Sequence, residues 1–190
     1  MIEKCIDFES IQKIYYETEK RLDNVITSIV QLLDRKRLKI AVAESCTGGL
    51  LSQKITSVSG ASHVFELGVC TYSNSMKEKM LSVSHEMLDL YGAVSSQVAE
   101  SMINGLYELS KADICLSVTG FAGPEGGTEN LPVGTVFLGV KYMQDSAFSV
   151  HLPFYRFGIN SREEIRNATA VCAFGIVYKL LMEGLECPKS

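Results

Sequence analysis

The sequence predicts an α/β protein: a three-layer α/β/α sandwich around a mostly parallel sheet of about five strands, with one antiparallel strand. Short apolar runs alternate along the chain with longer segments whose apolar residues recur at helical spacing. Near the C-terminal end, a tight turn joins two strand-like runs, which is typical of an antiparallel hairpin. Because no internal repeat or linker interrupts this pattern, we expect residues 1–190 to form a single domain.

The composition excludes several classes of protein. Hydrophobic residues make up 46% of the chain and charged residues 21%, with a formal net charge of -4. An acidic chain argues against a nucleic-acid partner, which usually requires a basic face. Neither a signal-peptide core nor a membrane-length run of ~18 uninterrupted apolar residues is present, so we expect no membrane partner. Since the cysteines are dispersed, we expect a reduced, cytoplasmic protein in which Cys70 and Cys115 are buried.

Local patterns define the elements of the first half of the chain. Apolar residues recur at helical spacing over residues 9–34, which indicates one long helix or two shorter ones. Residues 39–42 form a short buried strand. The segment 49–58 follows as a helix that a Ser-Gly pair ends. The pattern over residues 64–71 then predicts a second strand.

Two short helices come next, over residues 74–81 and 84–90, since each has a serine or asparagine able to cap its first turn. A longer helix spans residues 95–109. The residues 113–119 form a continuous apolar run that predicts a buried strand. The inward face of the longer helix consists of Val98, Met102, Ile103, Leu106 and Leu109.

The last third begins with a long irregular loop over residues 120–132, and loops of this length in compact domains are usually functional or disordered. Strands over residues 133–140 and 146–153 form the hairpin. Ser161 and Glu164 match a capping box, so the final helix begins there. Its inward face consists of Ile165, Ala168, Val171, Cys172, Ile176 and Leu180.

Three predicted strands end in residues that could form a site. Ser45 follows the first strand, Tyr72 the second, and the glycine-rich loop from Gly120 the third. Sites in such sheets gather at the carboxyl ends of the strands, so these residues should converge. Ser45 is the candidate nucleophile, because the strand-to-helix turn at residues 43–49 raises a short side chain and directs unpaired backbone N–H groups at its target.

A serine hydroxyl needs a base to remove its proton. His63, His85 and His151 do not follow strand ends, which disfavours histidine. Lys77 lies one turn into the helix after Tyr72, and it could act as a neutral base if burial lowers its pKa. The alternative is that Tyr72 only packs and Lys77 is solvated.

The loop after the third strand is rich in glycine, which permits close approach of backbone to a ligand and an anion-binding nest. It matches neither a P-loop nor a dinucleotide fingerprint, and it could simply be a wide turn. No cysteine, histidine or carboxylate cluster has metal-ligand spacing, so we expect neither metal nor cofactor.

Five motifs then occur in an order that resembles a known family. They are Ala-Glu-Ser-Cys-Thr-Gly-Gly (43–49), Thr-Tyr-Ser-Asn-x-x-Lys (71–77), Tyr-Gly-Ala-Val-Ser (91–95), Val-Thr-Gly-x-Ala-Gly-Pro-x-Gly-Gly (118–127) and Pro-Val-Gly (132–134). Together they resemble the C-terminal domain of the competence/damage-inducible protein CinA, also found as the stand-alone nicotinamide-nucleotide amidase PncC. Compared with that family, a helical segment at about residues 1–24 is additional, and we expect it to serve a homo-oligomer interface.

The resemblance implies hydrolysis of the carboxamide of nicotinamide mononucleotide, which gives nicotinate mononucleotide and ammonia without metal or ATP. The family's catalytic positions fall on Ser45 as nucleophile and on Lys77, assisted by Tyr72, as the proton carrier. For this reaction we assign oxyanion donors to the turn after Ser45, and nucleotide contacts to the glycine-rich loop and the final helix. These binding residues are Cys46, Thr47, Gly48, Thr119, Gly120, Gly123, Gly126, Gly127 and Arg162.

Two alternative hypotheses about the function of the chain remain open. The chain could be a non-catalytic binding or interaction module of the same fold, linked to competence or DNA damage. It could also be an amidase that acts on another small amide. Arg162 could equally be a solvated arginine at a helix end.

Overall fold

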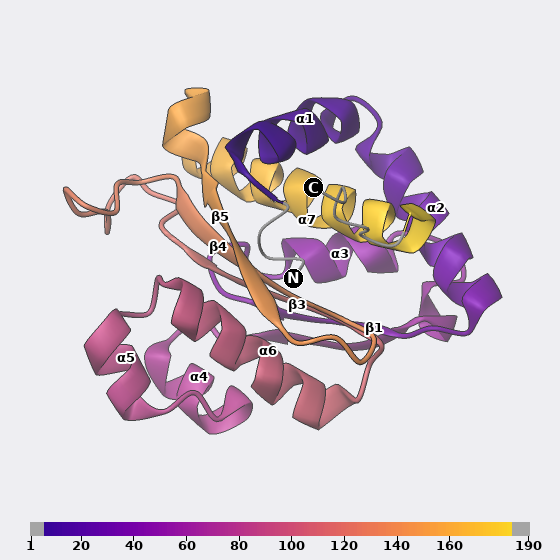
Figure 1. The fold of residues 1–190 in the computed structure, drawn as a ribbon, viewed down its shortest axis with the longest axis horizontal. Coiled ribbons are helices and arrows are strands. Elements are labelled where there is room, and N and C mark those ends of the chain that lie inside the picture. The colour runs from indigo at the N-terminus through magenta and orange to yellow at the C-terminus, as the bar shows by residue number, and fades with distance from the viewer. Residues whose placement is uncertain (1–5, 184–190) are drawn as a thin grey trace, which may run out of the picture.

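The computed structural model describes residues 6–183 and contains a five-stranded sheet between two layers of helices (Figure 1). The order across the sheet is β2-β1-β3-β4-β5. Strand β1 pairs in parallel with β2 and β3, whereas β4 pairs antiparallel with β3 and β5. Only β4 therefore runs against the others, and the predicted sandwich is confirmed. The strands are β1 (Ile40–Glu44), β2 (Phe65–Cys70), β3 (Ile114–Gly120), β4 (Thr135–Tyr142) and β5 (Phe148–Pro153).

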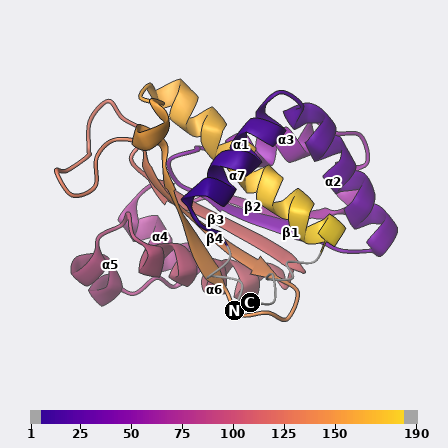
Figure 2. The ribbon, with the colours of Figure 1, turned by 45° about the horizontal axis from the view of Figure 1, so that its top comes forward.

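The helices divide between the two faces of the sheet (Figures 1 and 2). One layer contains α1 (Phe8–Glu19), α2 (Leu22–Lys36), α3 (Leu50–Thr56) and α7 (Arg162–Glu183), and the other contains α4 (Asn74–Leu81), α5 (His85–Tyr91) and α6 (Ser96–Ser110). Short 3-10 turns lie at Ala61–His63 and Phe154–Phe157. The periodic segment over residues 9–34 is thus two helices.

Strand β1 shows how the two faces are filled. Ile40 and Val42 belong to the core beneath α2, α3 and α7, whereas Ala41 and Ala43 belong to the core beneath α6. Successive side chains of a strand point to opposite faces. Glu44 continues the alternation of Ile40 and Val42, so its side chain points toward the α3 layer.

Helix α1 packs on α7 rather than on the sheet. Its apolar residues Ile11, Ile14 and Tyr15 are buried there. Gly175 of α7 makes the close approach possible, because a Cβ at that position would lie 2.5 Å from Ile14 Cγ2 and 2.7 Å from Thr18 Oγ1. The apolar side of α1 is thus used within the chain, and its service in a homo-oligomer interface stays a prediction.

Helix α7 forms the centre of its layer. Its predicted inward residues are all buried, and its first turn has the predicted capping box, in which Ser161 Oγ donates to Glu164 Oε2 at 2.7 Å. Among the residues described, it is the one helix long and apolar enough to cross a membrane. Most of that apolar stretch is buried inside the protein, as expected for a core helix.

Two burial predictions were wrong. Leu109 is 56% exposed, because helical periodicity gives the side of a helix but not where the covering elements end. Cys70 is exposed, because β2 is an edge strand whose alternate residues face solvent. Cys115 is buried as predicted.

Candidate active site

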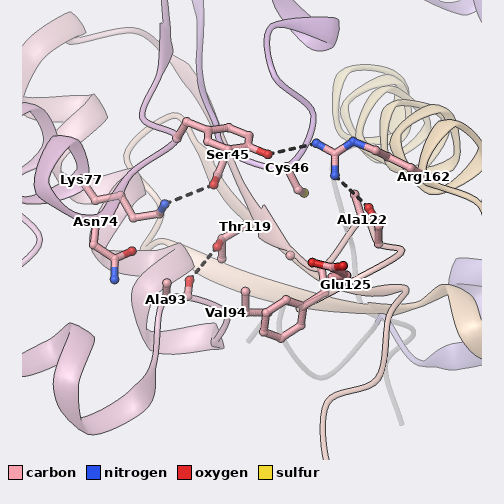
Figure 3. Close-up of a pocket in the computed structure, with 14 residues that line it drawn as sticks. Ser45, Cys46, Asn74, Lys77, Ala93, Val94, Thr119, Ala122, Glu125 and Arg162 are labelled. Atoms are coloured by element: carbon pink, nitrogen blue, oxygen red, sulfur yellow. Dashed lines mark hydrogen bonds between the residues drawn. The ribbon is translucent and has the colours of Figure 1, made fainter. Parts of the chain in front are cut away.

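A cavity of about 240 Å³ opens at the carboxyl ends of β1, β2 and β3 (Figure 3). The three predicted strand ends therefore do converge. From the residues proposed on sequence grounds, the cavity is lined by Ser45, Cys46, Tyr72, Lys77, Thr119, Gly120, Gly123 and Arg162. None of the three histidines contributes to the lining.

Lys77 lies against Ser45 within this cavity. Its Nζ donates to Ser45 Oγ at 3.1 Å and to the backbone carbonyl of Thr71 at 3.0 Å (Figure 3). The side chain is 1% exposed, and no carboxylate forms a salt bridge with it among residues 6–183. Burial lowers the pKa of Lys77, because desolvation disfavours the ammonium form. Lys77 is therefore not solvated, and a neutral amine in this place can accept the hydroxyl proton of Ser45.

The start of α4 positions this lysine. Ser73 caps the helix, with its Oγ accepting from the backbone N–H of Met76 at 3.3 Å. The backbone N–H of Lys77 bonds to the carbonyl of Ser73, so Lys77 lies in the first turn, directly after β2. Its side chain thus returns to the end of the strand that precedes the helix.

Glu44 organises the turn that carries Ser45. Its fully buried carboxylate accepts hydrogen bonds from the backbone N–H groups of Gly49, Leu51 and Ser52 at 2.9–3.0 Å, and from Ser52 Oγ at 2.7 Å. The unpaired donors in the first turn of α3 are therefore occupied by the protein itself. This corrects the expectation that the helix N-terminus is directed at the ligand.

Other donors near Ser45 remain available. Within the described part of the chain, no acceptor takes the backbone N–H of Cys46 or Thr47, whereas that of Gly48 donates to the carbonyl of Ser45 at 3.1 Å. Of these two residues, Cys46 lines the cavity, whereas Thr47 is fully buried outside the lining, so the N–H of Cys46 is the better-placed oxyanion donor.

The turn is fixed from two sides. Gly48 and Gly49 both have positive φ, 59° and 93°, which glycine adopts without strain. Arg166 of α7 donates from Nε and Nη2 to the carbonyl of Thr47, at 3.1 and 2.8 Å. The backbone around Ser45 is therefore anchored to both α3 and α7.

Arg162 connects three parts of the cavity rim. Its guanidinium donates to the carbonyl of Gly123 and to the hydroxyl of Tyr72, each at 3.0 Å (Figure 3). Tyr72 is 60% exposed, and among the described residues its hydroxyl bonds to Arg162 rather than to Ser45 or Lys77. Its assistance to Lys77 stays a prediction.

The remaining predicted residues differ in whether they line the cavity. Thr119 donates from Oγ1 to the carbonyl of Ala93 at 2.6 Å, which fixes the segment before α6. Thr47, Gly48, Gly126 and Gly127 do not line the cavity. The loop that contains the last two projects from the body of the molecule (Figure 1).

Sequence reasoning missed six residues of the lining. All six fall within the motifs already noted at residues 71–77, 91–95 and 118–127. Four of them occupy specified positions of those motifs, but these four carry no nucleophile or base, and the other two occupy variable positions. The missed residues are Asn74, Ala93, Val94, Phe121, Ala122 and Glu125.

The cavity also contains a thiol next to Ser45. Burial raises the pKa of Cys46 to about 12, because desolvation disfavours the thiolate. At neutral pH the group is therefore a weak nucleophile. Across residues 6–183, no cluster of three or more histidine, cysteine, aspartate or glutamate side chains is placed to hold a metal ion. Because the Cys46 thiol is a weak nucleophile and the Ser45 hydroxyl contacts Lys77, Ser45 is the better candidate nucleophile of these two residues.

Replacing Glu44 with glutamine is expected to lower the free energy of unfolding by about 3 kcal/mol. The amide keeps one acceptor oxygen but turns an NH₂ group toward backbone donors that lose their partner. Denaturant unfolding of the variant measures the change. Glu66→Gln is the matched control, because Glu66 on β2 forms a half-exposed ion pair with Lys39 at 3.9 Å. Its loss should cost less than about 1 kcal/mol. Equal stability of both variants would contradict the assigned role of Glu44.

The fold and this cavity define a three-layer α/β/α protein with a serine–lysine pair at the carboxyl ends of its parallel strands. Comparison with known proteins agrees with the sequence motifs. The chain belongs to the CinA C-terminal domain family, whose model matches residues 22–181. The match includes every residue of the cavity and begins after α1.

Relatives and solved structures support this assignment. The chain is 39% identical over 183 residues to a CinA-like protein of Thermotoga neapolitana, covering 96% of this chain and 42% of that protein. It is 42% identical over 161 residues to a CinA-like protein of Geobacter sulfurreducens, covering 84% and 38% respectively. The chain thus spans well under half the length of these curated relatives. The crystal structure of the competence/damage inducible protein CihA from Agrobacterium tumefaciens matches with a TM-score of 0.78 and 36% identity, covering 83% of this chain and 94% of that one.

Proposed function

We propose that the protein is a serine amidohydrolase that converts nicotinamide mononucleotide to nicotinate mononucleotide and ammonia. The observation that carries the proposal is the contact between the buried Lys77 Nζ and Ser45 Oγ at 3.1 Å, in a cavity of ligand size. The substrate class comes from the five motifs that resemble the nicotinamide-nucleotide amidases.

In the proposed reaction, Ser45 Oγ attacks the carboxamide carbon while neutral Lys77 takes its proton. The N–H group of Cys46 stabilises the developing oxyanion, and such a donor is often worth about 3 kcal/mol. Lys77 then passes its proton to the departing nitrogen, which leaves as ammonia. Water attacks the resulting acyl-enzyme, with Lys77 again accepting a proton, and releases the carboxylate product.

The remaining lining suits a nucleotide. Val94, Ala93 and Phe121 supply apolar walls for a flat ring. Arg162 can contact a phosphate, because arginine binds phosphate oxygens bidentately, and it would then exchange its bonds to Gly123 and Tyr72 for the ligand.

A binding module without turnover is the second candidate, favoured by the names of the relatives, which refer to competence and damage rather than to catalysis. The buried lysine argues against it. Desolvating an amine without a countercharge costs stability, and a scaffold that only binds has no need of that cost.

The test is ammonia release from nicotinamide mononucleotide by the purified protein, with nicotinate mononucleotide identified as the second product. We expect stoichiometric release of both, with the same rate in excess chelator. Binding of the nucleotide without release would favour the binding module. Release from simple amides but not from the nucleotide would indicate another amidase.

A further inference from the structure

We infer that Glu125 is a specificity-determining residue that selects nucleotides whose amide-bearing ring is positively charged. This inference rests on the proposed function and adds the feature of the substrate that the cavity recognises, which is the positive charge of its ring. Glu125 lies on the loop after β3, at a position that the loop motif leaves variable.

Glu125 lines the cavity, and no side chain of the described residues pairs with its carboxylate. Across residues 6–183, neither a hydrogen bond nor a salt bridge engages it, and the nearby Arg162 donates to Gly123 and Tyr72 instead. Figure 3 shows Glu125 set apart from Ser45 and Lys77, on the side where Arg162 enters.

The cavity thus holds two charged groups that do not take part in the reaction. Lys77 is buried and serves as the neutral base of the proposed reaction, so Glu125 and Arg162 are the charged side chains of the lining. Nicotinamide mononucleotide presents the complementary pair, a cationic pyridinium ring and an anionic phosphate. With the carboxamide at Ser45 and the phosphate near Arg162, the ring between them meets the negative field of Glu125.

The field of Glu125 has a direct chemical consequence. Reduction of the nicotinamide ring to the dihydropyridine removes its positive charge but keeps the carboxamide, the ribose and the phosphate. Glu125 should therefore favour the oxidised nucleotide over its reduced form. The size of the preference should match a partly exposed ion pair, about 5-fold in Kd.

The experiment measures Kd for nicotinamide mononucleotide and for its reduced form by titration calorimetry, in Ser45→Ala protein so that no turnover occurs. The ratio of the two Kd values is then compared after adding Glu125→Gln. We expect the preference for the oxidised form to fall about 5-fold. Because both ligands carry the same phosphate, effects through Arg162 cancel in the ratio. Glu129→Gln is the matched control, since it removes the same charge from the same exposed loop outside the cavity lining and should leave the ratio unchanged.

The outcomes separate this inference from the proposed function. An unchanged ratio in Glu125→Gln, or an equal change in Glu129→Gln, overturns the role of Glu125 even if the parent protein releases ammonia. A loss of preference confined to Glu125→Gln supports the role even if the parent protein releases none. Failure of both nucleotides to bind overturns the inference and the proposed substrate together.

Discussion

Replacing Ser45 with alanine is expected to lower the rate of ammonia release from nicotinamide mononucleotide by about 10⁴-fold or more. The substitution removes the hydroxyl to which Lys77 Nζ donates in the cavity, while the backbone turn stays held by Glu44 and Arg166. Steady-state ammonia release gives the rate. Mass spectrometry of rapidly quenched reactions should show an acyl adduct on the parent protein and none on the variant.

Ser75→Ala provides the matched control for this substitution. Ser75 is an exposed serine in the first turn of α4 that does not line the cavity, and its hydroxyl forms a hydrogen bond with Ser73 Oγ at 2.9 Å. This variant should retain the parent rate. A Ser45→Ala protein as active as Ser75→Ala would remove Ser45 from the mechanism.

Replacing Lys77 with methionine is expected to lower the same rate by about 10³-fold, within the usual range for loss of a general base. The stability of the variant should equal or exceed that of the parent protein. Methionine fills a similar volume, and the buried amine that it replaces forms no salt bridge with any residue from 6 to 183. Thermal unfolding should therefore show an equal or higher Tm for the variant.

The burial of Lys77 also makes the stability and the activity of the protein depend on pH. Because the pKa of Lys77 is lowered in the folded state, the unfolded chain binds this proton more readily. The resulting penalty on stability is greatest below the folded pKa and disappears as pH rises past the unfolded value. The Tm advantage of Lys77→Met should thus grow toward low pH, and the activity of the parent should rise as Lys77 loses its proton.

Lys79→Met is the control for both measurements. Lys79 lies on the same helix but is exposed, so its loss should change neither the rate nor the pH profile. A Lys77→Met protein that keeps the parent rate would contradict the assignment of the base. One that loses its fold would contradict the view that the lysine is retained for chemistry.

Much of the architecture could be predicted because local patterns determine it. Alternating apolar runs indicated the sheet, and capping residues indicated the helix starts at α4 and α5. Strand-end reasoning brought Ser45, Tyr72 and Lys77 to one cavity. The features that could not be predicted depend on which segments cover one another in the folded protein. Spacing did not decide whether Lys77 is buried, and it did not reveal the exposure of Cys70 on an edge strand.

The same limit applies to the polar framework of the site. A glutamate at the end of a strand carries no sequence signal that distinguishes a surface residue from a buried anchor, so the role of Glu44 was missed. The bond from Arg162 to Tyr72 joins residues 90 positions apart in the chain. Such contacts exist only after the layers have assembled, and single-sequence periodicity contains no information about them.

The packing of α1 on α7 shows that the boundary of homology is not the boundary of the folding unit. The family match begins at residue 22, yet Ile11 and Ile14 cover a surface of α7 that would otherwise meet water. The first two turns of α7 carry Arg162 and Arg166, which hold the rim of the cavity and the turn after Ser45. An appendage that does not line the cavity is therefore mechanically connected to the site, and sequence changes in it can tune how firmly the two arginines hold.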